Sequence, residues 1–366
     1  LHDSRAQTAE RVRQTTSNLA NLVEHNISSS ARGIDLSLQN IADWLEHMAE
    51  RHPDDRQIEA LLARHLARHP EVDAFRVSNR KGDVLWGKGV NRSAPATYTD
   101  RDYFAQHQAA PGQGLIVTEP LFGRVSGIWV VVFTRSYRNP DGSFAGVITA
   151  AVDLRHFTSL LSHLDLGPQG SAVIRHENFA LVTRHPPAAG PGGEIGNKRV
   201  SDEFRQIMES GVASGTFHTP QAPDGVERSY AFRRIGSTPM IVNVGMAPQD
   251  YLEPWYREAR NTVLLLLAFF ILSVIAARLI WRYWLRLQNQ SAFLESLIES
   301  LPLPVFYKDT DGRYLGCNRL YEAMLEKPRS EIVGKSVFDL APEEVARRYH
   351  EMDIRLFERP GNQSYE

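Results

Sequence analysis

The strongest feature of the hydropathy pattern is an unbroken apolar run over residues 262–277. It contains sixteen residues without a charge. With a rise of about 1.5 Å per residue, such a helix is slightly short for a hydrocarbon core of about 30 Å. Aromatic residues typical of membrane interfaces flank the run: Trp255, Tyr256, Trp281, Tyr283 and Trp284. The pattern predicts one transmembrane helix over residues 261–284, and the alternative is a buried core helix of a soluble protein.

The basic residues beside this helix predict its orientation. Arg278, Arg282 and Arg286 follow the run without accompanying acids, whereas the arginines before it are mixed with Asp and Glu. Lys and Arg are in excess on the cytoplasmic side of membrane helices. We therefore expect residues 1–260 to be periplasmic and residues 285–366 to be cytoplasmic.

Two narrow apolar stripes predict long helices on either side of the membrane. Residues 1–50 contain no proline, and five apolar residues recur there at alternating spacings of four and three: Ile34, Leu38, Ile41, Leu45 and Met48. Such a stripe packs either on a sheet or on a partner helix. Leu287, Leu294 and Leu301 are seven apart, which predicts a short coiled-coil linker over residues 285–301. Both stripes favour pairing of two copies, so we expect a homodimer.

From residue 72 the apolar period becomes that of strands, and the order of elements then repeats. The first unit, residues 72–164, has strand-like runs at 73–79, 84–88, 115–122, 128–138 and 145–154, with helices at 100–107 and 155–164. The second unit, residues 170–248, has strand-like runs at 171–175, 180–184, 215–219, 227–234 and 239–246, with a helix at 202–209. The predicted fold class is α+β, with two tandem units on one long N-terminal helix.

Composition and motifs exclude several kinds of function. The net charge of −2 over 366 residues gives no basic excess for a nucleic-acid partner. The single cysteine, Cys317, follows the membrane run, so the outer segment depends on its apolar core and not on disulfides. No metal-ligand spacing, nucleotide-binding loop or nucleophile motif occurs, so we expect no catalytic residue and no metal site. The chain starts without Met and stops within a pattern, which predicts a fragment with a signal anchor or a first membrane helix upstream.

Two stretches after the membrane run carry a family resemblance. LIESLPLPVFYKDTDGRYLGCNRLYEAML and EIVGKSVFDL resemble the first half of a PAS domain, over residues 292–366. Residues 1–260 resemble a double Cache domain, the extracellular ligand-binding sensor of bacterial receptors, through the long helix, DRDYF, GRVSG and NPDGSFAGVITAAVDL. The resemblances imply two tandem PAS-like units, one transmembrane helix in the bacterial inner membrane and the N-terminal part of a cytoplasmic PAS domain over residues 302–366.

The Cache resemblance also implies a ligand site in the first unit. In amino-acid-sensing members, an Arg and an aromatic pair hold the ligand carboxylate, and an Asp at the end of the last strand holds its amine. Arg101 matches that Arg, Tyr103 and Phe104 match the aromatic pair, and Asp153 matches the Asp. An arginine fork suits a carboxylate, and aromatic rings supply apolar area.

Three further residues complete the candidate ligand site. Tyr98 precedes Arg101 by three residues and can share its face, and Arg124 and Trp129 are additional candidates. Tyr103 stands where the family usually has Trp, and the family's first Tyr lies further upstream than Tyr98. The expected ligand is therefore a small carboxylate or amine and not one specified amino acid.

The same residues have a structural alternative. Asp102 and Asp153 suit helix starts, where a carboxylate accepts from free backbone N–H groups. Tyr103 and Phe104 would then belong to the hydrophobic core.

The resemblances imply a receptor that passes a ligand signal through the membrane helix and PAS domain to an output domain. We expect a diguanylate cyclase, and hence cyclic-di-GMP signalling. A sensor histidine kinase of a two-component system and a chemotaxis-type transducer are the alternatives. Cys317 precedes Asn318 outside any flavin-adduct motif, so Cys317 is expected in the core and no cofactor is expected.

Overall fold

The computed structural model describes residues 2–51, 53–362 and 364 and contains helices and strands in the predicted order. The chain divides into two compact units, residues 1–261 and 262–366. Helix α6 (Pro248–Ser300) begins in the first of these and continues in the second.

The first unit of the sequence pattern forms a six-stranded antiparallel sheet in the order β2-β1-β6-β5-β3, with β4 also paired to β5. Its strands are β1 (Val72–Ser78), β2 (Val84–Gly87), β3 (Ile116–Val117), β4 (Leu121–Phe122), β5 (Trp129–Arg138) and β6 (Phe144–Asp153). Its helices are α2 (Asp55–Leu66), α3 (Asp102–Ala109) and α4 (Leu154–Ser162). The run at 115–122, predicted as one strand, is two short strands. Pro120 lies between them and has no N–H to donate to a ladder.

The second unit forms a five-stranded antiparallel sheet in the order β8-β7-β11-β10-β9. Its strands are β7 (Ser171–His176), β8 (Leu181–His185), β9 (Ser214–Thr219), β10 (Arg228–Ile235) and β11 (Met240–Met246). Helix α5 (Asp202–Glu209) covers one face, with its N-terminus capped by Ser201. Short 3₁₀ turns occur at Ala49–Arg51 and Pro191–Gly193.

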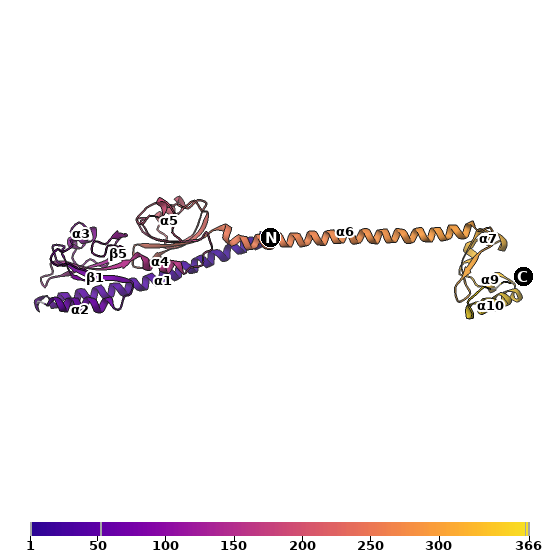
Figure 1. Ribbon diagram of the computed structural model, residues 1–366, viewed down its shortest axis with the longest axis horizontal. Helices are drawn as coiled ribbons and strands as arrows, with labels where there is room; N and C mark the ends of the chain where they lie inside the picture. The colour runs from indigo at the N-terminus through magenta and orange to yellow at the C-terminus, as the bar shows by residue number, and fades with distance from the viewer. Residues whose placement is uncertain (1, 52, 363, 365–366) are drawn as a thin grey trace. The chain divides into compact units, whose positions relative to one another are not determined.

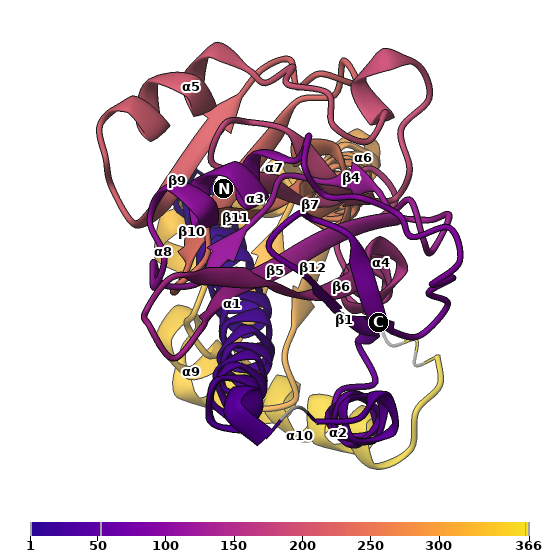
Figure 2. The same cartoon turned by 90° about the vertical axis from the view of Figure 1, so that its left-hand side faces the viewer.

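Helix α1 (His2–Met48) is the common support of both sheets (Figures 1 and 2). Ile27, Ile34, Leu38 and Ile41 are fully buried in one hydrophobic core that includes residues of β1, β5, β6, β7, β10 and β11. The stripe therefore packs on sheets of its own chain. The expectation that this stripe favours pairing of two copies is wrong for its apolar face, because that face is already covered.

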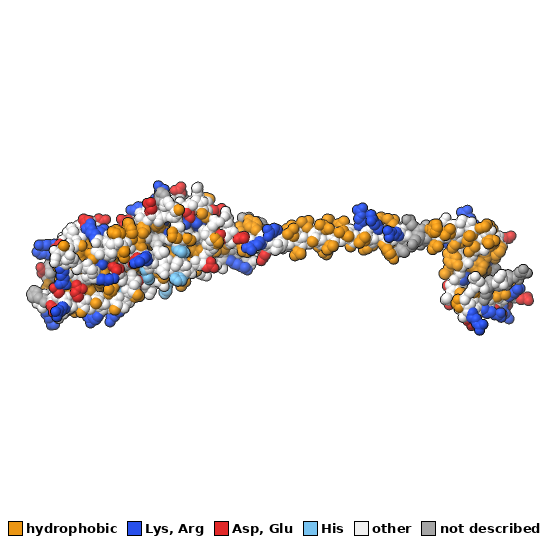
Figure 3. Space-filling view, in the orientation of Figure 1, with side chains coloured by type: hydrophobic (Ala, Val, Ile, Leu, Met, Phe, Trp, Pro, Cys, Tyr) orange, Lys and Arg blue, Asp and Glu red, His pale blue; other side chains and the backbone are white. Residues whose placement is uncertain are grey.

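The apolar part of α6 is long and apolar enough to cross a membrane, within Pro248–Arg286. None of the most apolar stretch is buried within the protein, and Figure 3 shows hydrophobic side chains along it. The alternative of a buried core helix in a soluble protein does not apply. The heptad stripe of residues 287–301 falls partly on 287–292, whose side chains lie outside the described residues. The described Leu294, Leu297 and Leu301 are exposed.

The unit after the membrane run begins with a hairpin of β12 (Phe306–Lys308) and β13 (Tyr314–Cys317). It is followed by α7 (Arg319–Leu325), α8 (Arg329–Ile332), α9 (Val337–Leu340) and α10 (Glu343–Glu358). The buried Asn318 side chain accepts from the Val305 and Tyr321 backbone N–H groups, so one residue caps α7 and holds the preceding segment. Cys317 is buried with Tyr314 and Tyr321, as predicted.

The two leucines Leu36 and Leu38 test the role of α1. Leu38 is fully buried and Leu36 is 59% exposed on the same helix. We expect Leu38→Ala to lower the free energy of unfolding of the outer segment by about 2–5 kcal/mol, because it leaves a cavity under the sheets. Leu36→Ala should change it by less than about 0.5 kcal/mol. Urea unfolding of the chain in detergent measures both, and equal effects would contradict a single buried stripe.

Candidate functional site

A pocket lies on the face of the first sheet that does not contact α1. Alternate residues of β5 and β6 point to opposite faces, so Val132 and Thr149 face this pocket while their neighbours face the core. Residues 98–103 and 121–126 cover it. The pocket and the open space at its mouth together amount to about 360 Å³. We call this the first-unit pocket.

Two tyrosines form the aromatic wall of the first-unit pocket. The Tyr98 hydroxyl lies 3.4 Å from Thr149 Oγ1 on the sheet, and its ring meets the Tyr103 ring edge-on at 5.7 Å. Burial raises the pKa of both phenols. Both rings therefore stay neutral at physiological pH and can offer an apolar face and an O–H donor to a ligand.

Three arginines line the first-unit pocket, and two of them have acidic partners. Arg124 donates to both carboxylate oxygens of Asp100 and to the Thr97 carbonyl. Arg76 reaches Asp73 at 3.4 Å. Arg101 donates to the Phe122 carbonyl at 3.1 Å, and no carboxylate pairs with it among the described residues. The pocket therefore presents one arginine whose charge a ligand carboxylate can neutralise.

The loop of residues 123–126 adds a group that sequence reasoning did not single out. Ser126 Oγ is buried against the first-unit pocket and has no hydrogen-bond partner among the described residues. Buried hydroxyls are normally paired, so this one is available to a ligand or to water. Arg76 and Thr149 were also missed, because only the pairing of β1, β5 and β6 brings them to this face.

Four of the seven candidate site residues line the first-unit pocket, namely Tyr98, Arg101, Tyr103 and Arg124. The other three lie elsewhere. Phe104 is buried behind the pocket against Phe144, and Trp129 is 40% exposed and packs on Phe122. Asp153 caps α4 by accepting from the Arg155 N–H at 2.8 Å, and it pairs with the Arg155 guanidinium at 2.6 Å.

A buried histidine attaches α3, part of the pocket cover, to the sheet. His107 Nε2 lies 2.9 Å from Thr134 Oγ1 on β5, and the residue is fully buried. Burial lowers the pKa of His107 to about 4. The imidazole is therefore neutral at physiological pH and can exchange a single hydrogen bond with the threonine.

The described residues contain no group of three or more His, Cys, Asp or Glu side chains placed to hold a metal ion. The polar groups of the first-unit pocket are guanidinium, phenol and hydroxyl groups. Such groups recognise oxygen-rich organic anions rather than cations.

Comparison with known families assigns both parts of the chain. The Cache domain family model dCache_1 matches residues 2–255, and the PAS fold model matches residues 292–362. A stretch of 79 residues of this chain is also 32% identical to the aerobic respiration control sensor protein ArcB of Escherichia coli. That match covers 22% of this chain and 10% of ArcB, so this chain matches about a tenth of that protein's length.

Several solved extracellular sensor domains share the fold of the outer segment. The extracellular domain of the histidine kinase rpHK1S-Z16 is 24% identical, with a TM-score of 0.59, covering 68% of this chain and 99% of that domain. The periplasmic sensory domain of the Campylobacter jejuni chemoreceptor Tlp1 is 9% identical, with a TM-score of 0.55, covering 68% and 99%. The ligand-binding domain of Mlp24 with asparagine is 16% identical, with a TM-score of 0.50, covering 66% and 95%.

The buried His107 predicts a specific pH dependence of stability. Its folded pKa of about 4 lies below the value of 6.5 for an exposed histidine. Between these values the unfolded chain binds a proton that the folded chain does not, so stability falls as pH falls. From pH 6.5 to pH 5, this contributes a loss of about 1.6 kcal/mol. His107→Gln keeps a hydrogen-bonding group but does not titrate. Its unfolding free energy should fall less over this range, and parallel curves for the two proteins would contradict a neutral buried imidazole.

Proposed function

The chain belongs to the Cache domain family, and we propose that it is a membrane receptor whose first-unit pocket binds a small carboxylate. The observation that carries the proposal is Arg101, which lines an aromatic-walled pocket without an acidic partner among the described residues. Its planar fork suits two carboxylate oxygens. The neutral Tyr98 and Tyr103 supply apolar area and O–H donors.

The remaining candidates take supporting roles in this proposal. Arg124, fixed by Asp100, shapes the cover, while Phe104 and Trp129 hold it from outside the pocket. Asp153 follows Ala151 by two residues on the same face of β6. A ligand amine that extends along β6 would reach Asp153 after displacing Arg155. The asparagine bound to Mlp24, which shares the fold, is a ligand of this amine and carboxylate type.

A comparison of two arginines tests the ligand site. Small carboxylates and amino acids are screened for compounds that raise the melting temperature of the chain in detergent, since a ligand at 100 times its Kd adds about 2.7 kcal/mol. We expect Arg101→Ala to abolish the shift. Arg155→Ala, which removes a guanidinium that is 84% exposed, should retain the response to a carboxylate without an amine. A shift that survives Arg101→Ala would place the ligand elsewhere.

The proposed relay runs through α6. This helix leaves the second sheet after β11 and continues through the candidate membrane span to the hairpin of the PAS region. Arg278, Arg282 and Arg286 support a periplasmic location for residues 1–260 and a cytoplasmic one for residues 285–366, across a bacterial inner membrane. The exposed Leu294 and Leu301 support pairing of two copies in a homodimer through this linker.

The proposed output of the receptor is a diguanylate cyclase. A sensor histidine kinase is the second candidate, because the fold of the outer segment occurs in the kinase rpHK1S-Z16. The full-length receptor is expected to convert GTP into cyclic-di-GMP. Transfer of phosphate from ATP to a histidine would instead identify the kinase. If neither activity is found, the chemotaxis-type transducer remains as the third candidate.

A further inference from the structure

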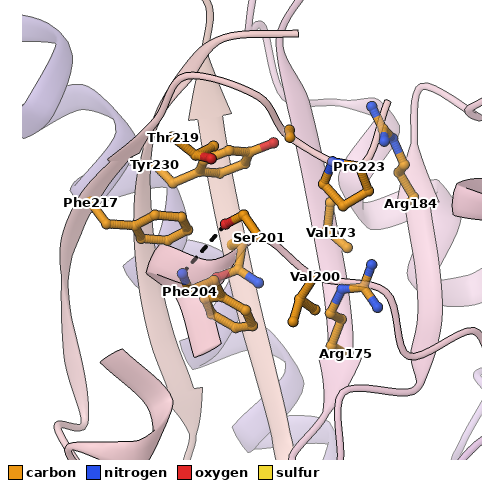
Figure 4. A pocket seen from close by; sticks show the side chains of 12 residues that line it. Val173, Arg175, Arg184, Val200, Ser201, Phe204, Phe217, Thr219, Pro223 and Tyr230 are labelled. Atoms are coloured by element: carbon orange, nitrogen blue, oxygen red, sulfur yellow. Dashed lines mark hydrogen bonds between the residues drawn. The ribbon is translucent and has the colours of Figure 1, made fainter. Parts of the chain in front are cut away.

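The second unit contains its own pocket, between its sheet and the start of α5 (Figure 4). The pocket and the open space at its mouth together amount to about 440 Å³. Strands β7, β8, β9, β10 and β11 all contribute side chains to its lining. We call this the second-unit pocket. It is separate from the first-unit pocket, because the two share no lining residue.

Asn243 on β11 is a polar residue in a place that suits an apolar one. The residue is 5% exposed, and its strand neighbours in the two ladders are Val173 and Phe232. Its Oδ1 atom is buried and has no hydrogen-bond partner among the described residues. An unpaired buried amide oxygen destabilises a protein, so a residue of this kind suggests a donor that binds in the pocket.

Arg175 on β7 supplies a buried cation to the same pocket. It is 6% exposed, and its Nη1 donates to the Phe179 and Asn197 carbonyls at 2.7 and 3.1 Å. Burial lowers its pKa to about 10, so the guanidinium remains charged at neutral pH. No carboxylate pairs with Arg175 among the residues described here. A buried guanidinium without a counter-ion favours binding of an anion.

The other charges near the second-unit pocket disfavour a ligand ammonium group. Arg184 also lines the pocket, and it pairs with Asp224, which in addition accepts from Arg228 at 2.8 Å. The described lining contains two arginines and no acidic residue. The donor that meets Asn243 Oδ1 is therefore expected to be neutral, such as a hydroxyl group.

The remaining wall of the second-unit pocket is aromatic. The Phe217 and Tyr230 rings stack at 5.1 Å, and the Phe204 ring lies 5.5 Å from Phe217. Figure 4 shows these three rings on the side of the pocket opposite Arg175 and Arg184. Such a wall suits an aliphatic or aromatic ligand body.

We propose that the second-unit pocket binds a short-chain 2-hydroxycarboxylate. Arg175 receives the carboxylate, Asn243 Oδ1 accepts from the 2-hydroxyl, and the carbon chain packs on the aromatic wall. Arg175 pairs with Ile241 across β7 and β11, so it lies diagonally from Asn243 on the same face of the sheet. A carboxylate and its adjacent hydroxyl can therefore contact both side chains at once.

Three probes with one carbon skeleton test the chemistry. These are 2-hydroxy-4-methylpentanoate, 4-methylpentanoate and leucine, which differ only in a hydroxyl, hydrogen or ammonium group at the second carbon. In titration calorimetry of the chain in detergent, we expect the hydroxy acid to bind about ten-fold more tightly than the other two, the difference expected for one hydrogen bond. No binding of the hydroxy acid, or tighter binding of leucine, would overturn the proposal.

Variants of single lining residues test whether the hydroxy acid binds in this pocket. Asn243→Val should lower the affinity for the hydroxy acid about ten-fold, so that it equals the affinity for 4-methylpentanoate. The same change should raise the melting temperature of the ligand-free chain by about 2–4 °C, because it removes an unpaired buried group. Arg175→Gln should lower the affinity for both carboxylates. Arg199→Gln is the control, because Arg199 is an exposed arginine of the same unit, and it should leave binding unchanged.

The outcomes separate this site from the first-unit pocket. If Asn243→Val binds the hydroxy acid as wild type does, the proposal is wrong, even where Arg175→Gln fails to fold. If Arg101→Ala alone abolishes binding, the hydroxy acid occupies the first-unit pocket and the second site is refuted. If Arg101→Ala shows that the first-unit pocket binds no carboxylate, the test with Asn243→Val remains valid, because the two residues line different pockets.

Discussion

The burial of one face of α1 is the interaction on which the rest of the outer segment depends. Neither sheet has a second sheet to cover its apolar face, and a sheet of five or six strands needs such a cover to be stable. The 47-residue helix α1 contributes to this cover on both sheets, together with residues of α2 and α4. Because its apolar stripe is continuous, the two sheets share one hydrophobic core and not two separate ones.

This arrangement leaves the opposite face of each sheet free for other uses. Side chains alternate along a strand, so every apolar residue that faces α1 sets its neighbours toward the outer face. On the first sheet, that face carries Thr149, and Arg101 of the covering segment 98–103 lines the same pocket. In the second, it carries Arg175 and Asn243. Both outer faces thus combine an arginine without an acidic partner among the described residues with an aromatic wall, at the expense of some local stability.

The two pockets differ in how their polar groups are held. In the first-unit pocket, most polar groups come from a cover of short elements, such as α3, which His107 and Phe104 attach to the sheet. In the second-unit pocket, Arg175 and Asn243 project from adjacent strands of the sheet itself. Groups on paired strands are more rigidly placed than groups on a cover. A ligand in the first-unit pocket is therefore better able to move part of the structure on binding.

The sequence alone determined the order of elements, because apolar periodicity and turn residues are local properties. It placed the long helix, both sets of strands, the apolar span within α6 and the hairpin that ends before Asn318. It also pointed to Arg101 and Tyr103 as candidates, because they follow each other closely on one segment, and both line the first-unit pocket. The tertiary structure decided which elements and side chains contact one another. Whether the α1 stripe met a sheet or another helix depended on contacts distant in sequence, as did the role of Phe104. Asn243 and Arg175 carry no local signal at all, since only the pairing of β7 with β11 brings them together on one buried face.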